Sequence, residues 1–290
     1  MLLKSRADPN VVVNCEWREF ATTPLFEAAV NGHTRIARML LGAGAKVNTK
    51  VGPGYSAVYN AAFNGHVDTL RLLVESGADV NAMTEDEFSP LYIACQQGNT
   101  ACVHALLESN ASPDLARAKE GATALYIASQ NGQTTCVEAL LSAGSSSATV
   151  DLPMSDGSTP LMIACYFQHA RVVELLLRAG ASLALRDKRG RDALEWAKQR
   201  NDALVVALVQ EELAARAAAR FANGDFGHGG WFGFGAGGDA AGGKGGGDGG
   251  DGSGGGGFFC ALTRSLMCCL SPSSGRCCSC GCLAPHAKGA

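Results

Sequence analysis

A six-residue phrase recurs along this chain about every 33 residues, and this periodicity constrains the fold more than any other feature of the sequence. Typical copies read Thr-Pro-Leu-Phe-Glu-Ala and Ser-Pro-Leu-Tyr-Ile-Ala. The copies begin at Thr23, Ser56, Ser89, Thr123 and Thr159, with a degenerate copy at Asp192, so the steps are 33, 33, 34, 36 and 33 residues. A fixed period of this size predicts a stack of small units rather than one globular core. A stack offers surface rather than a pocket, which makes binding the first functional hypothesis.

Each unit is predicted to contain two helices joined by a tight turn. The Thr or Ser at the phrase start can cap a helix, and Pro at the next position suits its first turn. The phrase ends in a small alanine, which allows neighbouring helices to approach closely. A glycine then ends the first helix, and a second apolar helix follows, as in residues 36–41. This second helix ends at a residue able to adopt the left-handed conformation. These end residues are Gly44, Gly77, Asn110, Gly144 and Gly180.

These motifs resemble the ankyrin repeat, whose units carry a Thr-Pro-Leu-His-x-Ala phrase, a Gly-His pair and a Leu-Leu-x-x-Gly-Ala ending. The match is clear at Gly32-His33, at Gly65-His66 and over residues 72–81, and the resemblance covers about residues 1–213. It implies an all-α solenoid of helix-turn-helix units with β-turn or hairpin loops. Two departures stand out. The phrase histidine is replaced by Phe26, Tyr59, Tyr92, Tyr126 and Met162, and the fifth unit has Gln168-His169 in place of Gly-His.

The composition divides the chain into four parts. Residues 1–22 match a truncated repeat and a loop, which suggests that the chain is a piece of a longer one or that its true start lies upstream. Residues 23–221 hold the repeats and a C-terminal capping helix. Residues 222–257 form a Gly-rich segment that is expected to be a flexible linker. Residues 258–290 form a Cys-rich tail, which we expect to be disordered together with the linker.

Catalysis is not indicated anywhere in the sequence. Residues 233–238 fit the spacing of a dinucleotide-binding loop, but no predicted strand precedes them and no predicted helix follows. The histidines form no recognisable arrangement with a nucleophile. His33 and His66 instead share one repeat position, which indicates a structural role. We therefore expect no enzymatic activity, no cofactor and no bound metal.

The charge balance and the hydropathy narrow the partner and the compartment. Lys and Arg number 24 against 27 Asp and Glu, so a nucleic-acid partner is not expected. No signal peptide is apparent, and no segment has the roughly 20 continuous apolar residues that cross a bilayer. These features predict a cytoplasmic monomer with a protein partner.

The cysteines fall into two groups, one in the repeats and seven residues within 260–282. Without a secretory context, reduced thiols are favoured over a disulfide framework. Inside the repeats, Cys95, Cys102, Cys136 and Cys165 take recurring core places and are interpreted as small buried hydrophobic residues. In the tail, S-acylation of Cys268, Cys269, Cys277 and Cys278 would tether the chain to a membrane. Binding of a soft metal ion, or no defined role, are the alternatives for the tail.

The family resemblance implies that a partner protein binds along the concave face, where the first helices and the turn tips lie. The partner-binding residues expected there are Tyr55, Phe63, Asn64, Glu85, Asp86, Phe88, Gln96, Gln97, Gln130, Asn131, Tyr166, Phe167, Arg189 and Arg191, with Lys119, Glu120 and Lys188 beside them. The aromatic residues of this set are expected to be exposed, with packing against a neighbouring tip as the alternative. Charge changes from acidic at residues 85–87 to basic at residues 188–191.

The leading functional hypothesis is a non-catalytic interaction module or scaffold. A membrane-tethered adaptor anchored by the acylated tail is the second hypothesis. A fragment of a larger ankyrin-containing enzyme or channel is the third.

Overall fold

The computed structural model describes residues 8–14, 20–117, 120–143, 150–200 and 203–222. All of these residues belong to a compact unit that spans Met1–His228. The second unit, Gly229–Ala290, lies outside the described residues, and so do the Cys-rich tail and nearly all of the Gly-rich linker. The predictions made for the tail cysteines and for residues 1–7 therefore also fall outside the described part of the chain.

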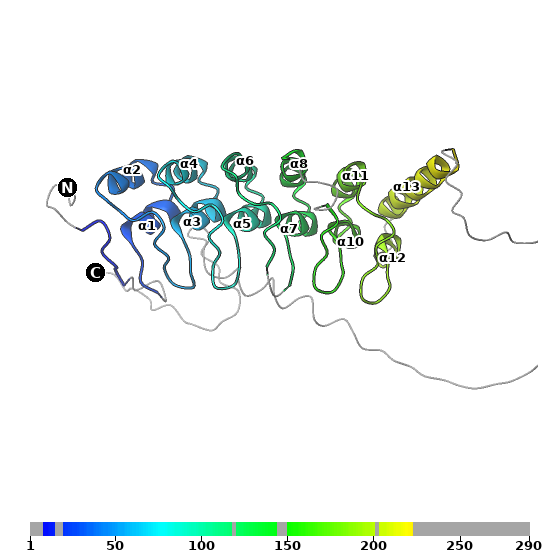
Figure 1. The fold of residues 1–290 in the computed structure, drawn as a ribbon, viewed down its shortest axis with the longest axis horizontal. Coiled ribbons are helices and arrows are strands. Elements are labelled where there is room, and N and C mark those ends of the chain that lie inside the picture. The colour runs from blue at the N-terminus through cyan, green and yellow to red at the C-terminus, as the bar shows by residue number, and fades with distance from the viewer. Residues whose placement is uncertain (1–7, 15–19, 118–119, 144–149, 201–202, 223–290) are drawn as a thin grey trace, which may run out of the picture. The chain divides into compact units, whose positions relative to one another are not determined.

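The described helices form two parallel rows (Figure 1). One row contains the first helices of the units, which are α1 (Pro24–Val30), α3 (Ala57–Asn64), α5 (Pro90–Gln97), α7 (Ala124–Gln130), α10 (Pro160–Tyr166) and α12 (Ala193–Lys198). The other row contains the second helices, which are α2 (Thr34–Gly42), α4 (Val67–Glu75), α6 (Thr100–Glu108), α8 (Thr134–Ser142), α11 (Ala170–Arg178) and α13 (Ala203–Ala222). The predicted all-α solenoid of paired helices is confirmed.

The first helices begin where the repeated phrase predicts. The side-chain oxygens of Thr23, Ser56, Ser89, Thr123 and Thr159 each accept a hydrogen bond from the backbone N–H three residues later, at 3.1–3.3 Å. Such caps satisfy an N–H group that would otherwise lack a partner inside the helix. In the degenerate copy, Asp192 and Glu195 cap each other's backbone N–H groups at 3.0 and 2.9 Å. The sixth unit therefore keeps its helix start despite its changed sequence.

Left-handed residues end the helices, and two of them are not glycine. Asn110 has φ 61° at the end of the third unit, where the sequence predicts a left-handed residue. Gln168 has φ 64° in the fifth unit, at the place that Gly132 takes in the fourth. The turn between α10 and α11 thus keeps the common geometry, and the Gln168 Nε2 group donates to the Arg200 carbonyl at 3.0 Å. The departure in sequence changes the residue and leaves the turn intact.

The turns inside the units are also the places where one unit is tied to the next. His66 and His169, at equivalent positions, lie 3.0 Å through Nε2 from the carbonyls of Val30 and Gln130 in the preceding units. A Cβ atom at Gly132 would approach the Nδ1 atom of His169 to 2.6 Å, so only glycine fits beneath that ring. The structural role predicted for His66 is supported by its bond, whereas His33 is exposed.

A ladder of asparagines connects the ends of the second helices. Asn10, Asn48 and Asn81 accept hydrogen bonds from the backbone N–H groups of Lys46, Asp79 and Ser112 at 2.8–2.9 Å. Because Asn10 makes the same contact as the other two, residues 8–14 take the place of the turn of a preceding unit. The contact made by Asn10 is consistent with the prediction that residues 1–22 include part of a repeat.

The apolar core runs continuously between the two helix rows. It contains the phrase alanines Ala28, Ala61, Ala94, Ala128 and Ala164, and the cysteines Cys95, Cys102, Cys136 and Cys165, as predicted. The first layer is covered less than the others. Ile36 on α2 is 49% exposed, whereas its equivalents Thr69, Cys102, Cys136, Val172 and Val205 are fully buried. Each of those equivalent positions is shielded by the unit before it.

The last layer is held by α13, which extends the row of second helices. Arg216 of α13 donates from Nη1 to the Ala181 carbonyl at 2.7 Å and from Nη2 to the Leu177 carbonyl at 3.1 Å, and its Nε lies 2.7 Å from Glu212 Oε1. A cation placed against the last carbonyls of α11 also interacts favourably with the dipole of that helix.

Replacing Arg216 with alanine is expected to lower the free energy of unfolding by about 2 kcal/mol, because hydrogen bonds from a charged group are lost at a half-buried site. Urea denaturation followed by circular dichroism measures the change. Arg171→Ala is the matched control, since Arg171 is half exposed and its ion pairs to Glu138 and Glu174 should contribute little. Equal losses in the two variants would contradict the role given to Arg216.

Candidate protein-binding surface

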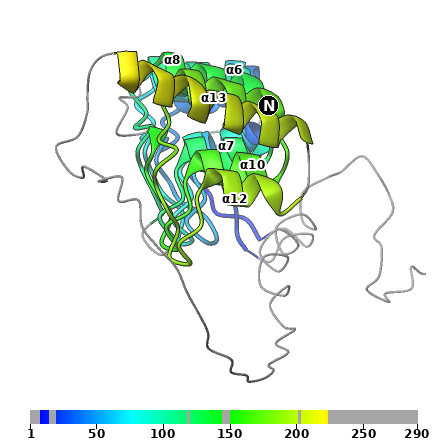
Figure 2. The ribbon, with the colours of Figure 1, turned by 90° about the vertical axis from the view of Figure 1, so that its right-hand side faces the viewer.

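The loops before the first helices form a row of narrow fingers that gather on one side of the stack (Figure 2). Each finger is closed by a backbone hydrogen bond across its base, such as Met154 N–H to Ser158 O at 2.9 Å. Successive fingers are also bonded to each other. The backbone N–H groups of Glu85, Ser155 and Lys188 donate to the carbonyls of Pro53, Glu120 and Asp156 at 2.7–3.0 Å. These bonds join the second finger to the third and the fourth, fifth and sixth to one another, and the Arg117 Nε group, which donates to the Asp86 carbonyl, joins the fourth finger to the third.

One finger carries backbone strain that the others avoid. Glu87 has φ 63°, while Gly54, Gly121, Gly157 and Gly190 take the equivalent left-handed place in the other fingers. The left-handed region is unfavourable for a residue with a Cβ atom.

Glu87→Gly is therefore expected to raise the free energy of unfolding by about 1 kcal/mol, as relief of strain outweighs the added freedom of the unfolded chain. Urea titration checks this result. The reverse change at an equivalent place, Gly157→Ala, should destabilise the chain, because its Cβ would meet Asp187 Cα at 3.1 Å. A stability loss in Glu87→Gly would show that its side-chain contacts outweigh the strain.

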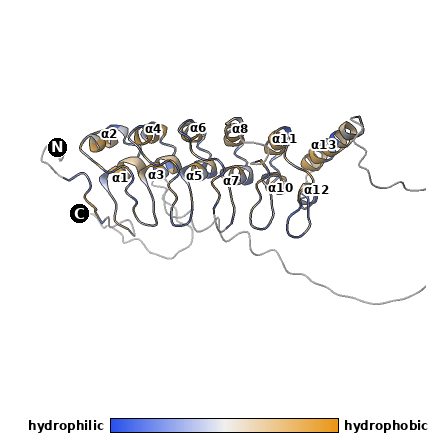
Figure 3. Ribbon diagram, viewed as in Figure 1, coloured by the Kyte–Doolittle hydropathy of each residue, from blue (hydrophilic) through white to orange (hydrophobic). Residues whose placement is uncertain are grey.

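The residues predicted to bind a partner differ in how far the structure exposes them. Those that are exposed are Glu85, Asp86, Gln97, Asn131, Phe167 and Arg189, which we call the candidate binding face. Those that are half-buried are Tyr55, Phe63, Asn64, Gln96, Gln130, Tyr166 and Arg191. The fingertips are coloured largely hydrophilic in Figure 3, so the face combines polar tips with a few apolar groups from the helix ends.

The prediction that Phe88 is exposed is wrong. Its side chain is only 7% exposed, and its ring centroid lies 5.3 Å from that of Tyr92. The guanidinium carbon of Arg117, from the next finger, lies 4.3 Å from the centre of the Phe88 ring. Arg117 also donates from Nε to the Asp86 carbonyl at 3.2 Å and pairs with Glu120 at 2.6 Å. Phe88 is therefore the packed base of a finger, which is the alternative considered for it.

The aromatic residues at the C-terminal end of the face form a cluster whose members differ in exposure. Phe167 is 38% exposed and meets Tyr166 edge-to-face, with ring centroids 5.2 Å apart. Tyr166 in turn meets Trp196 at 5.6 Å, and the guanidinium carbon of Arg200 lies 4.6 Å from the Tyr166 ring. Rigid aromatic rings beside an arginine are the usual energetic centres of protein interfaces. Phe167 is the member of this cluster that remains most open to a partner.

In the last finger, the basic residue Arg191 forms its contacts within the unit. Asp187 is buried and lies 2.7 Å through Oδ2 from Arg191 Nη2, and Trp196 donates from Nε1 to the same oxygen at 3.1 Å. The Arg191 guanidinium also lies over the Trp196 ring at 4.5 Å. The charge of Arg191 is thus neutralised within the unit. The outward basic charge of this finger comes from Lys188 and Arg189, both of which are exposed.

Three residues that shape this surface were missed by sequence reasoning. Arg117, Arg200 and Asp187 act across a unit or between two units, on side chains that lie 29, 34 and 9 residues away along the chain. No motif marks such pairs.

Within the described residues, no group of three or more His, Cys, Asp or Glu side chains could hold a metal ion. Among the same residues, no helix is long and apolar enough to cross a membrane. What the surface offers is hydrogen-bonding groups, an exposed phenyl ring and charges of both signs, arranged on a regular scaffold.

Comparison with known proteins agrees with this architecture. No curated protein matches the chain. Among solved structures, the ankyrin repeat domain of Bcl-3, described as a unique member of the IκB protein family, is 25% identical with a TM-score of 0.62, and the match covers 72% of this chain and 89% of that one. An ankyrin repeat domain from Acinetobacter baumannii AYE is 28% identical with a TM-score of 0.60, covering 65% and 97%.

A third structure shows likeness in fold alone, at 22% identity and a TM-score of 0.59, covering 66% of this chain and 98% of the other. It contains the predatory endopeptidase Bd0816 of Bdellovibrio bacteriovorus in complex with the immunity protein Bd3460.

Family models match most of the repeats directly. A model of three ankyrin repeats matches residues 1–84 and 81–153, and a single-repeat model matches residues 156–188. These matches span more than half of the chain, and they coincide with the helix pairs and fingers described above. The chain belongs to the ankyrin repeat family.

Proposed function

We propose that this chain is a non-catalytic scaffold that holds a partner protein along the candidate binding face. Ankyrin repeat domains are generally protein–protein interaction modules and are typically non-catalytic. The observation that carries the proposal is the ordered strip of fingers from the second to the sixth, which are linked by backbone hydrogen bonds and, between the third and fourth, by the Arg117 side chain. Because the strip is held in place before binding, little conformational entropy is lost when a partner docks.

The charges of the face favour a partner with a defined polarity. Glu85 and Asp86 extend from the third unit, and Lys188 and Arg189 extend from the sixth. A partner segment with basic groups at one end, acidic groups at the other and an apolar side chain against Phe167 would be complementary. Such charge pairs mainly steer association and are weakened by salt.

Binding measurements on point variants test this function. Partners are first captured from cell extract with the full chain and identified, and the affinity of each purified partner is then measured by calorimetry. Phe167→Ala should weaken binding tenfold or more, as expected for an aromatic anchor. Glu85→Lys combined with Asp86→Lys should weaken binding and reduce its dependence on salt. Arg171→Glu, on the row of second helices, serves as the control.

The two possible outcomes are distinct. Loss of affinity with unchanged circular dichroism supports the candidate binding face. Partners that bind all these variants as tightly as the natural sequence would place the interface elsewhere, and the proposal would fail.

A membrane-tethered adaptor is the second candidate, supported by the sequence of the tail. Cys268, Cys269, Cys277 and Cys278 lie close together, and the nearby charged residues Arg264, Arg276 and Lys288 are all basic. Two acyl chains, or one with a basic patch, give stable anchoring. Hydroxylamine-sensitive acyl exchange on these cysteines would support a tether, and its absence from the cell-derived protein would remove this candidate.

A further inference from the structure

Among the described residues, one junction between units of the stack brings two cysteines together. Cys95 follows the phrase alanine of the third unit, and Cys136 lies in the second helix of the fourth. The places equivalent to Cys95 hold Ala29, Ala62, Ser129 and Cys165, and those equivalent to Cys136 hold Ile36, Thr69, Cys102, Val172 and Val205. At the other junctions, Cys102 is opposite Ala62 and Cys165 is opposite Val205, so each thiol there stands alone.

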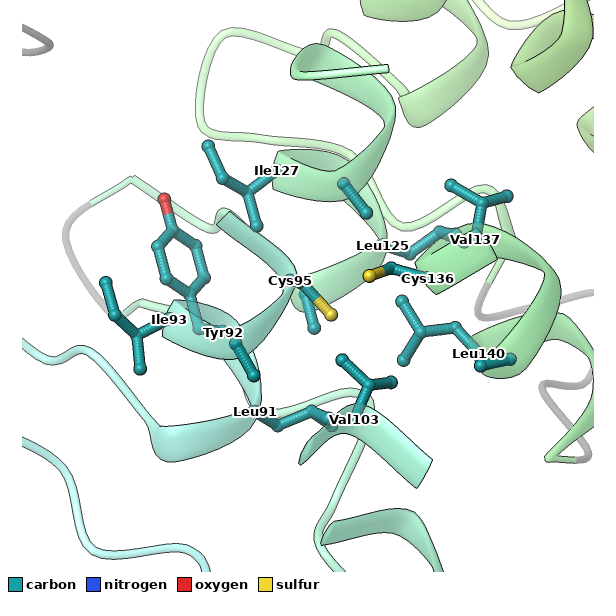
Figure 4. Close-up of a cluster of buried hydrophobic side chains, with 14 of the residues drawn as sticks. Leu91, Tyr92, Ile93, Cys95, Val103, Leu125, Ile127, Cys136, Val137 and Leu140 are labelled. Atoms are coloured by element: carbon teal, nitrogen blue, oxygen red, sulfur yellow. The ribbon is translucent and has the colours of Figure 1, made fainter. Parts of the chain in front are cut away.

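The two sulfur atoms lie close together in an apolar cluster. Figure 4 shows the side chains of Cys95 and Cys136 directed toward each other, with Leu91, Val103 and Leu140 around them. The Thr100 hydroxyl oxygen lies 3.5 Å from Cys136 Sγ. Both cysteines are free and fully buried.

This environment shifts the pKa values of the two thiols in opposite directions. The hydrogen bond from Cys95 lowers the pKa of Cys136 to about 7, while burial acts in the opposite direction and the Thr100 hydroxyl helps to lower it. Burial, followed by the hydrogen bond to Cys136, raises the pKa of Cys95 well above its usual value. The directions of these two pKa shifts favour Cys136 over Cys95 as the attacking thiolate.

We propose that Cys95 and Cys136 form an oxidisable dithiol, a modification site at which a hydroperoxide closes a disulfide between the third and fourth units. The inference rests on the facing thiols of α5 and α8 and is independent of the proposed binding function.

The reaction balances with one peroxide. The Cys136 thiolate attacks an oxygen of hydrogen peroxide, so that an S–O bond forms, the O–O bond breaks and hydroxide leaves as water after taking up a proton. The Cys95 sulfur then attacks the Cys136 sulfur and gives up its proton. The S–S bond forms, the S–O bond breaks, and the second hydroxide leaves as water. Two thiols and one peroxide thus give one disulfide and two waters.

Access to the buried thiols comes from the modular construction of the stack. Each unit contacts only its neighbours, so one junction can open without unfolding the whole chain. Opening between the third and fourth units admits the small oxidant, and reclosing returns the sulfurs to contact. A disulfide would then join α5 to α8 and would restrain the middle of the stack.

Peptide mapping of the full chain tests the proposal. The reduced protein is treated with hydrogen peroxide under native conditions, alkylated, unfolded and digested with trypsin. Cleavage after Arg71, Arg117, Lys119 and Arg171 places Cys95 in peptide 72–117 and Cys136 in peptide 120–171. The expected product is this pair of peptides joined by a disulfide. The bridge should also raise the midpoint of thermal unfolding by roughly 5–15 °C, reversibly with dithiothreitol.

The residues at equivalent positions of other repeats indicate substitutions that should preserve the fold. Cys95→Ala introduces the residue found at Ala62, and Cys136→Val introduces the residue found at Val172. Both should abolish the joined peptides and the thermal shift. Cys102→Thr and Cys165→Ala, which alter the lone thiols in the same two peptides, should retain both effects.

Two results would overturn the proposal. One is that Cys95 and Cys136 remain open to alkylation after unfolding, although peroxide has oxidised the tail cysteines of the same sample. The other is that the joined peptides form only when peroxide is added in urea, since this would show that the native junction does not bring the sulfurs into reaction.

Discussion

Phe88→Ala is expected to lower the free energy of unfolding by about 3 kcal/mol, because it removes a buried aromatic ring from the base of a finger. The ring lies against Tyr92 and beneath the guanidinium group of Arg117, so its loss leaves a cavity and frees that arginine. Thermal and urea unfolding monitored by circular dichroism measure the loss. Phe88→Ala is expected to lower stability, whereas replacing an exposed binding residue would lower affinity with little change in stability.

Phe167→Ala is the matched comparison for Phe88→Ala. It removes the same side chain from a place that is 38% exposed, so the change in stability should stay below about 1 kcal/mol. The two variants together separate packing from recognition. If Phe88→Ala unfolded at the same urea concentration as the natural sequence, the packed position of its ring would be contradicted.

Asp187→Ala is expected to cost about 3 kcal/mol, since it leaves Arg191 and the indole N–H of Trp196 without their buried partner. The Asp187 carboxylate also accepts the backbone N–H groups of Arg189 and Arg191 at 2.9 and 2.8 Å. Asp187→Asn should lose about half as much, because its single amide oxygen can accept the two backbone bonds and its NH2 group cannot accept the other two. Urea titrations of both variants measure the difference.

The stability of this finger should also depend on pH. Burial alone would raise the pKa of Asp187, but the hydrogen bonds and charge of Arg191, with the backbone of Arg189, hold it below the ordinary value of 3.8. A folded-state pKa below that of the unfolded chain stabilises the fold above about pH 4. This contribution is lost as the pH falls through the folded-state pKa. The free energy of unfolding of Asp187→Ala should depend less on pH below about 4 than that of the natural sequence. An unchanged dependence would show that Asp187 is not the source of the effect.

Asp156→Ala is a control for both effects, because Asp156 is an aspartate of the preceding finger for which the described residues provide no ion pair. It accepts the Ser158 backbone N–H at 2.8 Å and is half-buried. Asp156 also accepts the Ser158 hydroxyl at 2.5 Å, and the loss of these two bonds near the surface should cost about 1–2 kcal/mol, less than the loss of Asp187.

The features that recur with the period of the chain could be predicted from the sequence. The caps at Thr23 and Ser89, the buried Ala94 and the left-handed Asn110 are all set by contacts within one unit or with an identical neighbour. Such contacts repeat whenever the residue type repeats. The fold and the location of the fingers follow directly from them.

The side chains of the fingers could not be predicted equally well, because their exposure depends on individual residues of the adjacent finger. Phe88 is buried because Arg117 covers it, and Arg191 is neutralised because Asp187 is buried beneath it. Neither pairing repeats in the other units, so no periodic pattern predicts it. The binding roles of the exposed residues remain predictions for the same reason.

The link that Arg216 makes to the carbonyl ends of α11 predicts how hydrogen exchange is distributed along the stack. In a chain whose layers contact only their neighbours, loss of one such link should destabilise the adjacent layer more than distant ones. Amide hydrogens of α11 should therefore exchange with solvent sooner in Arg216→Ala than in the natural sequence, whereas those of α2 should exchange at the same rate in both.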